Sequence, residues 1–307
     1  MERIVRDSRI FCILDACSII NLLHIDEDGK LIERLNKLEI LICEEVFKEV
    51  ERNVFTRIGK FDRIAGAKSI FERKQVRKEI DQKLGVIRGW TVLNETINED
   101  FGKDYFAKVA KMTSYKKRNG ELDSTAIALA LTRTEECKLF FHTDDFVAKA
   151  YFKTFYRDQQ IGYIEDSADL LLLLYRLDEK FNLKELDELL SRLASEYNLE
   201  VSSLIKRLES FNLSAKEYQR TRKLRPNLQE LLRKLRNRDF EGLNYLYEFF
   251  KKNKSKHSRI FEAFEKHKIV IELEPAQGST NLIGKIRRLR ARLKESPVHD
   301  LESLLSL

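Results

Sequence analysis

Short apolar runs separated by helical segments constrain the fold of the first half of this chain most strongly. Four such runs predict buried strands: Arg9–Leu14, Leu38–Cys43, Lys138–His142 and Ile161–Ile164. Segments with helical character, 18–23 and 44–52, follow the first two runs. The charged stretch between Asn53 and Asn119 is expected to be helical, with one further strand at Trp90–Leu93. Strands that alternate with helices indicate an α/β fold, a parallel sheet covered on both faces.

The second half has a different pattern, typical of amphipathic helices. Leucines recur with i, i+3, i+4, i+7 spacing at Leu186, Leu189, Leu190 and Leu193. The same spacing recurs at 201–208 and at 228–235, and Pro226 lies near the start of the latter helix, where its missing N–H costs little. We therefore predict a sheet-containing domain over residues 1–165 and an all-helical region over residues 166–307.

Charge is distributed unevenly along the 307 residues, which carry a formal net charge of +7. Between Lys216 and Arg238 nine residues are basic and two acidic, and six of the ten residues from Lys285 to Lys294 are basic. A basic surface favours an anionic partner such as nucleic acid, although solvated helix faces give the same pattern. The candidate nucleic-acid contacts are Arg233, Lys234, Arg236, Arg238, Arg287, Arg288, Arg290 and Arg292.

Several classes of protein are disfavoured by what the sequence lacks. The four cysteines form no CxxC pair, which predicts reduced core cysteines in a cytoplasmic protein. The longest leucine run, Leu170–Leu174, is far shorter than the roughly twenty residues of a membrane span. The N-terminus lacks the apolar stretch of a secretory signal, and no GxxxxGK[ST], GxGxxG, HExxH or GxSxG motif occurs. We expect a soluble protein with no membrane partner.

Acidic residues follow two of the predicted strands. Asp15 comes directly after the first apolar run, and Asp145 lies three residues after His142. In open parallel sheets, ligands bind at the carboxyl ends of the strands. If these two strands are neighbours, both carboxylates face one crevice. Two further carboxylates lie on flanking helices, Glu49 beside an apolar helix face and Asp123 in the first turn of a small-residue helix.

Four carboxylates in one crevice repel one another unless a cation neutralises them. Because no cysteine or histidine joins them, the oxygen ligands favour Mg²⁺ or Mn²⁺. Such an ion activates water and stabilises charge on a phosphoryl group, which is the chemistry of phosphodiester hydrolysis. Taken singly, Glu49 also fits an ordinary surface helix, and Asp123 also fits a residue that complements a helix N-terminus.

The order of these segments resembles the PIN-domain nuclease family over residues 9 to 165. Ile13–Leu22 resembles the opening motif, an apolar strand with Asp and small residues before an apolar helix. Ile42–Glu51 resembles the second motif, in which a valine precedes the acidic ligand by three residues. Gly120–Ala130 resembles the third motif and Phe141–Ala150 the fourth.

This resemblance implies a metal-dependent endoribonuclease, often the toxin of a toxin–antitoxin pair. It implies ligands at Asp15, Glu49, Asp123 and Asp145. Glu121 and Asp144 are alternatives, because the motifs tolerate an acidic residue at either place. The stretch 53–119 and the helical half depart from the compact toxins, and these departures count against a toxin role but not against the fold.

Other functions fit parts of the pattern. One is a nuclease-fold module that binds nucleic acid with little turnover. Another is a nuclease whose helical half docks an antitoxin or another protein subunit. A homodimer is a further expectation for the partner of this chain. A phosphatase of the haloacid dehalogenase type is disfavoured, because Cys17 stands where that class places an aspartate two residues after Asp15. RNA is the favoured substrate, on the resemblance alone.

Overall fold

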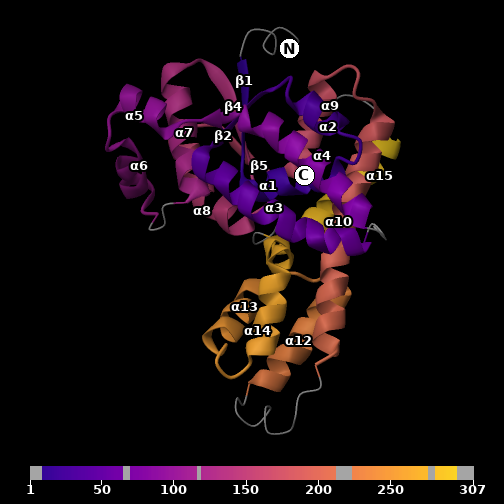
Figure 1. The fold of residues 1–307 in the computed structure, drawn as a ribbon. Coiled ribbons are helices and arrows are strands. Elements are labelled where there is room, and N and C mark those ends of the chain that lie inside the picture. The colour runs from indigo at the N-terminus through magenta and orange to yellow at the C-terminus, as the bar shows by residue number, and fades with distance from the viewer. Residues whose placement is uncertain (1–8, 65–69, 116–118, 212–222, 276–280, 296–307) are drawn as a thin grey trace. The chain divides into compact units, whose positions relative to one another are not determined.

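The computed structural model describes residues 9–64, 70–115, 119–211, 223–275 and 281–295 (Figure 1). Contacts within the chain divide it into two units, Met1–Leu189 and Leu190–Leu307. The domain boundary predicted between residues 165 and 166 therefore lies inside the first unit. As a division between domains of different function it stays a prediction.

The first unit contains the predicted parallel sheet. Its strands are β1 (Arg9–Leu14), β2 (Glu39–Cys43), β3 (Thr91–Val92), β4 (Cys137–His142) and β5 (Tyr163–Glu165). Its helices are α1 (Ala16–Ile25), α2 (Lys30–Leu35), α3 (Glu44–Ile64), α4 (Ile70–Arg88), α5 (Asn94–Phe101), α6 (Tyr105–Thr113), α7 (Gly120–Thr134), α8 (Phe146–Asp158) and α9 (Ser167–Leu177). The strands are all parallel, in the order β3-β2-β1-β4-β5. The predicted α/β class is confirmed.

Strand β1 lies at the centre of the sheet, and its last four residues are buried because both neighbouring strands and the covering helices shield them. From β1 the chain continues outward through β2 and β3, then returns to the other side of β1 to form β4 and β5. The order of the strands therefore reverses between β1 and β4. In doubly wound sheets this switch point opens a crevice at the carboxyl ends of the strands.

Helices cover both faces of the sheet, as two adjacent residues of β4 show. Phe141 stacks on Tyr156 of α8, with ring centroids 6.0 Å apart. The next residue, His142, places its Nδ1 3.3 Å from the carbonyl oxygen of Asp166, which begins α9. Since successive side chains of a strand point to opposite faces, α8 and α9 lie on opposite sides of the sheet. This double cover explains why the strands are nearly continuous apolar runs.

The second unit is helical wherever the structure describes it. Helix α10 (Leu183–Glu209) begins in the first unit and continues into the second. It is followed by α12 (Leu224–Asn237), α13 (Leu243–Lys252), α14 (Ser258–Lys266), the 3₁₀ helix η1 (Lys268–Leu273) and α15 (Leu282–Glu295). The predicted leucine seams are buried, at Leu190 and Leu193 in α10 and at Leu231 and Leu235 in α12. Among the described helices, none combines the length and apolarity needed to cross a bilayer.

Candidate active site

Asp15 lies where β1 ends and α1 begins, at the switch point of the sheet. Its carboxylate accepts a hydrogen bond from the backbone N–H of Ala16 at 2.8 Å and caps the helix. It also accepts from the hydroxyl of Thr143 at 2.8 Å and from the thiol of Cys17 at 3.1 Å. The backbone N–H of Asp15 donates to the carbonyl of His142, the last residue of β4. The carboxylate is thereby fixed between the two strand ends and is only 5% exposed.

Asp145 follows the neighbouring strand β4 and caps α8. Its Oδ1 accepts from the backbone N–H groups of Val147 and Ala148, at 2.7 and 3.2 Å. The backbone N–H of Asp145 donates to the hydroxyl of Thr143 at 3.1 Å, and that hydroxyl in turn donates to Asp15. Thr143 therefore connects the two aspartates that the sequence placed at adjacent strand ends.

Glu121, in the first turn of α7, is joined electrostatically to three of the other predicted carboxylates. Burial raises the pKa of Glu121, and the negative charges of Asp145 and then Glu49 raise it further. Burial also raises the pKa of Asp15 to about 7, with Glu121 the next largest cause. Asp15, Glu49 and Asp145 are thus each connected to Glu121 by a charge interaction. We call these four residues the acidic cluster.

Asp123 is the α7 residue that the family resemblance favours, and it is buried near the end of β2. The charges of Asp123 and Asp15 add to the effect of burial in raising the pKa of the Cys43 thiol to about 12. Glu121 and Asp123 thus both lie close to the strand ends, as predicted for α7. The interactions with Asp145 and Glu49 make Glu121 the stronger candidate for a shared role with them.

The start of α7 lies against α3 because Gly120 has no side chain. A β-carbon at Gly120 would come within 2.7 Å of the Cγ2 atom of Val46. Val46 is three residues before Glu49 on α3, and Glu121 follows Gly120 directly. The close contact therefore brings the second turn of α3, which carries Glu49, near the start of α7, which carries Glu121.

Asp144 has a structural role that separates it from the acidic cluster. One carboxylate oxygen accepts from Asn21 of α1 and from the hydroxyl of Ser167, both at 2.6 Å. The other oxygen accepts from the backbone N–H of Ser167 at 2.8 Å. The buried carboxylate thus fastens the end of β4 to α1 and α9. Of the two adjacent aspartates, Asp145 is the better candidate ligand.

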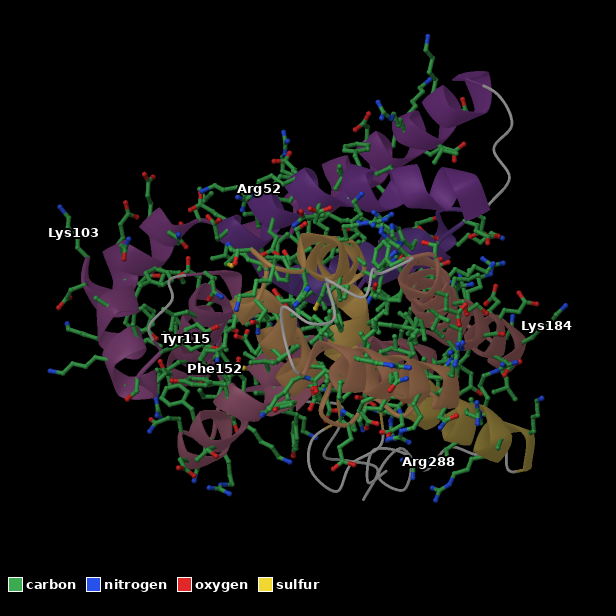
Figure 2. The ribbon with its side chains drawn as sticks, turned by 90° about the horizontal axis from the view of Figure 1, so that it is seen from below. Arg52, Lys103, Tyr115, Phe152, Lys184 and Arg288 are labelled. Atoms are coloured by element: carbon green, nitrogen blue, oxygen red, sulfur yellow. The ribbon has the colours of Figure 1, made fainter. Side chains whose placement is uncertain are left out.

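Three residues that the sequence did not single out contact the site. Thr143 and Cys17 bond to Asp15, and the hydroxyl of Tyr115 lies 3.3 Å from the Glu121 carboxylate. The ring of Tyr115 packs on Phe152 with centroids 4.9 Å apart; both are labelled in Figure 2. Thr143 stands directly before Asp144 and Asp145 in the fourth motif, so its position in the sequence could have identified it. No sequence signal identifies Tyr115, whose contact depends on the packing of α6, α7 and α8.

The donor set suits a hard divalent cation, because it consists of carboxylates whose mutual repulsion a cation would relieve. Within the part of the chain that the structure describes, no three His, Cys, Asp or Glu side chains are placed to hold one metal ion together. Asp15 and Asp145 are fixed by helix caps, whereas Glu49 and Glu121 have longer side chains and are half-buried. A shared ion would therefore need Glu49 and Glu121 to change rotamer.

The predicted nucleic-acid contacts on α12 are mostly held in ion pairs. Arg233 pairs with Glu230 at 2.7 Å, Lys234 with Asp239 at 2.9 Å and Arg236 with Glu209 at 2.6 Å. Arg238, the residue that follows α12, differs, because it donates to neutral groups of Asn198, Leu235 and Ser202. On α15, Arg287, Arg288 and Arg292 are exposed and Arg290 is half-buried; Arg288 is labelled in Figure 2.

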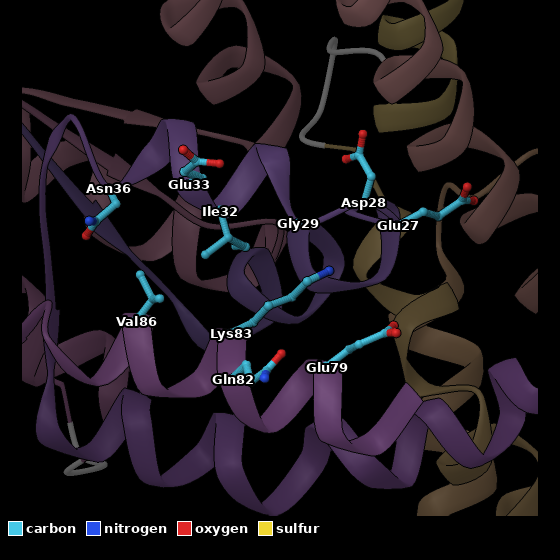
Figure 3. A pocket seen from close by; sticks show the side chains of 10 residues that line it. All are labelled: Glu27, Asp28, Gly29, Ile32, Glu33, Asn36, Glu79, Gln82, Lys83 and Val86. Carbon is cyan, nitrogen blue, oxygen red and sulfur yellow. The ribbon is translucent and has the colours of Figure 1, made fainter. Parts of the chain in front are cut away.

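A cavity of about 500 Å³ between α2 and α4 is unsuited to an anionic substrate. Figure 3 shows four carboxylates around it, those of Glu27, Asp28, Glu33 and Glu79. Its one lysine, Lys83, is bonded to the carbonyl and the carboxylate of Asp26. This cavity is therefore not part of the candidate active site.

Comparison with known proteins finds no family model, no curated protein and no solved structure that matches this chain.

Proposed function

We propose that this chain is a metal-dependent nuclease of the PIN type that hydrolyses phosphodiester bonds as an endoribonuclease. The observation that carries the proposal is the acidic cluster at the switch point, where Asp15 and Asp145 cap helices at adjacent strand ends. The resemblance of the four motifs supports the choice of family, and RNA as the substrate rests on that resemblance.

In this proposal Mg²⁺ or Mn²⁺ is held by Asp15 and Asp145, with Glu49 and with Glu121 or Asp123. A divalent ion supplies activation of water and stabilisation of charge on the phosphate. The protein's own contribution is to hold the carboxylates in place. Thr143 fixes the orientation of Asp15 through its hydroxyl. Outer hydrogen bonds of this kind typically change metal affinity or activity about 10–100-fold when removed.

A cleavage assay in which the carboxylates are replaced one at a time tests the proposal. Wild type, Asp15→Asn and Glu49→Gln are incubated with labelled single-stranded RNA and DNA, with Mn²⁺, Mg²⁺ or EDTA. Glu45→Gln is the matched control, because Glu45 lies one turn before Glu49 on α3 and is ion-paired with Arg52. We expect metal-dependent cleavage that both site variants abolish and the control retains. Cleavage that survives in Asp15→Asn would refute the proposed site.

The same assay decides which carboxylate of α7 belongs to the site. Glu121→Gln is expected to lose activity if Glu121 shares an ion with Asp145, whereas Asp123→Asn is expected to lose it if the family pattern holds at that position. The second candidate function is binding without turnover. The basic residues of α15 favour it, and it predicts RNA binding by wild type and Asp15→Asn with cleavage by neither.

A further inference from the structure

A cleft lies between α10 and α15 within the second unit. Cationic side chains line one side of it, and side chains with hydroxyl and amide groups line the other. Its volume is about 450 Å³. The cations come from α15 and the polar groups from α10: Arg287, Arg290 and Lys294 on one side, Ser191, Ser195 and Asn198 on the other. Small and apolar residues complete the lining, namely Ala194, Ile283, Ile286 and Ala291.

The two walls follow from helical spacing. Arg287, Arg290 and Lys294 are three and four residues apart, so they lie along one side of α15. Leu289 and Leu293 of the same helix are buried, which holds α15 in its place in the unit. On α10, Ser191, Ser195 and Asn198 are likewise spaced by four and three residues. Two polar stripes therefore face each other along the cleft.

Every charged residue that lines this cleft is a cation, and no carboxylate is among its lining residues. A fourth positive charge lies behind the α10 wall. The guanidinium of Arg238 donates to the amide oxygen of Asn198 at 3.0 Å and to the hydroxyl of Ser202 at 3.2 Å. A third bond goes to the carbonyl of Leu235, so the partners are neutral groups. A concave surface lined by charges of one sign concentrates counter-ions of the opposite sign.

The cations of α12 provide the contrast. Arg233, Lys234 and Arg236 belong to the same unit and each is paired with a carboxylate, so their positive charge is compensated locally. Arg287 and Lys294, by contrast, line a cavity that has no carboxylate among its lining residues.

We propose that this cleft binds a phosphate group of a nucleic-acid strand. Guanidinium groups bind phosphate oxygens through paired N–H donors, and the hydroxyl of Ser191 is a further donor to such a group. The phosphate chemistry follows from the cleft alone, whereas the polymeric ligand rests on the proposed nuclease function. An exposed row of cations over a groove suits a backbone contact that does not depend on base sequence.

Binding of labelled single-stranded RNA to the full chain, measured in EDTA so that no cleavage occurs, tests this inference. The cleft variant is Arg287→Ala with Lys294→Ala. The control is Arg233→Ala with Arg236→Ala, which removes the same charge from the same unit at ion-paired positions. We expect the cleft variant to weaken binding at least about tenfold. The slope of the logarithm of the binding constant against the logarithm of the salt concentration should decrease in magnitude by about one for each phosphate contact removed. The decrease should be smaller in the control.

Two further measurements complete the test. Ser195→Asp places a carboxylate in the cleft at an exposed position, and it should weaken binding with the fold intact. Thermal unfolding with millimolar inorganic phosphate, against chloride at equal ionic strength, tests for a small ligand. If phosphate stabilises wild type but not the cleft variant while RNA affinity is unchanged, the phosphate site stands and the strand is excluded. Equal behaviour of cleft and control variants in both measurements overturns the proposal.

The experiments distinguish a wrong cleft proposal from a wrong nuclease proposal. Binding in EDTA requires neither metal nor the acidic cluster, so Asp15→Asn should bind RNA as wild type does. In Asp15→Asn, loss of cleavage with retained RNA binding would support both proposals. In the cleft variant, retained cleavage with unchanged RNA binding would refute the cleft proposal alone.

Discussion

Asp15 is a buried acid whose pKa rises from 3.8 to about 7, through burial and the charge of Glu121. The folded chain then keeps a proton that the unfolded chain has lost. Consequently the free energy of unfolding falls as pH rises from about 4 to about 7 and levels off above that range. Asp15→Asn has no such proton, so its free energy of unfolding lacks this pH dependence. Relative to wild type, the variant should therefore gain stability as pH rises from 4 to 8, by at most about 4 kcal/mol. Urea unfolding in EDTA measures this difference.

Asp178→Asn is the control, because the stability contribution of Asp178 changes with pH in the opposite direction. A hydrogen bond from Arg34 lowers the pKa of Asp178, so its stabilising effect is present above the unfolded pKa and is lost as pH falls. This variant should therefore lose stability at pH 8 and little at pH 3. A pH profile of Asp15→Asn that parallels wild type would show that Asp15 is not the buried acid described above.

Some residues of the candidate site were predicted from the sequence and others were missed, for identifiable reasons. Asp15 and Asp145 were predicted because each follows an apolar run, and a strand end is visible in the sequence. The choice between Asp144 and Asp145 was not visible, since it depends on Ser167, a partner 23 residues further along the chain. Tyr115 was missed because its contact with Glu121 exists only once α6 and α7 are packed.

At the scale of elements, the approach of α7 to α3 depends on Gly120. A β-carbon there would come within 2.7 Å of Val46, so Gly120→Ala must push the two helix starts apart. Overpacking of this kind costs about 1–3 kcal/mol. We expect a loss of stability and, because Glu121 and Glu49 move apart, a larger loss of metal-dependent cleavage than the stability change explains. Unfolding and cleavage of the same preparation measure both.

Gly85 in α4 provides the matched control. A β-carbon at Gly85 meets nothing within 4 Å, and alanine is the better helix former. Gly85→Ala should therefore raise stability by about 0.5–1 kcal/mol and leave cleavage unchanged. If Gly120→Ala matches Gly85→Ala in both measurements, the contact with Val46 does not position the site.

The elements themselves were largely predictable, because buried parallel strands are continuous apolar runs. The first strand was predicted with its observed ends, and Trp90–Leu93 contains the two-residue β3. Apart from this strand, the segment between Asn53 and Asn119 was predicted only as helical. Its division into separate helices follows from contacts with the rest of the unit, such as the bond from Tyr105 of α6 to the carbonyl of Ala126 in α7.

At the scale of the whole molecule, the predicted boundary at residue 165 cuts through contacts that hold the sheet. Helix α9, which starts at Ser167, buries the leucines Leu170–Leu174 and has the capping box of Asp166 and Asp169 at its start. The predicted boundary, placed after the last predicted strand, assigned this leucine run to the helical half. Its contacts with α1 and β4 place it with the sheet.

A fragment of residues 1–165 should therefore fail to fold as a cooperative unit, whereas a fragment of residues 1–189 should fold. The shorter fragment lacks Ser167, so the buried carboxylate of Asp144 loses two of its donors, and it lacks the leucines that cover one face of the sheet. The longer fragment keeps these groups and the bonds from Arg34 to Asp178 and Glu185. Circular dichroism during urea unfolding distinguishes the two. A cooperative transition in the 1–165 fragment would show that α9 is dispensable for folding. The domain would then end at residue 165, as the sequence predicted.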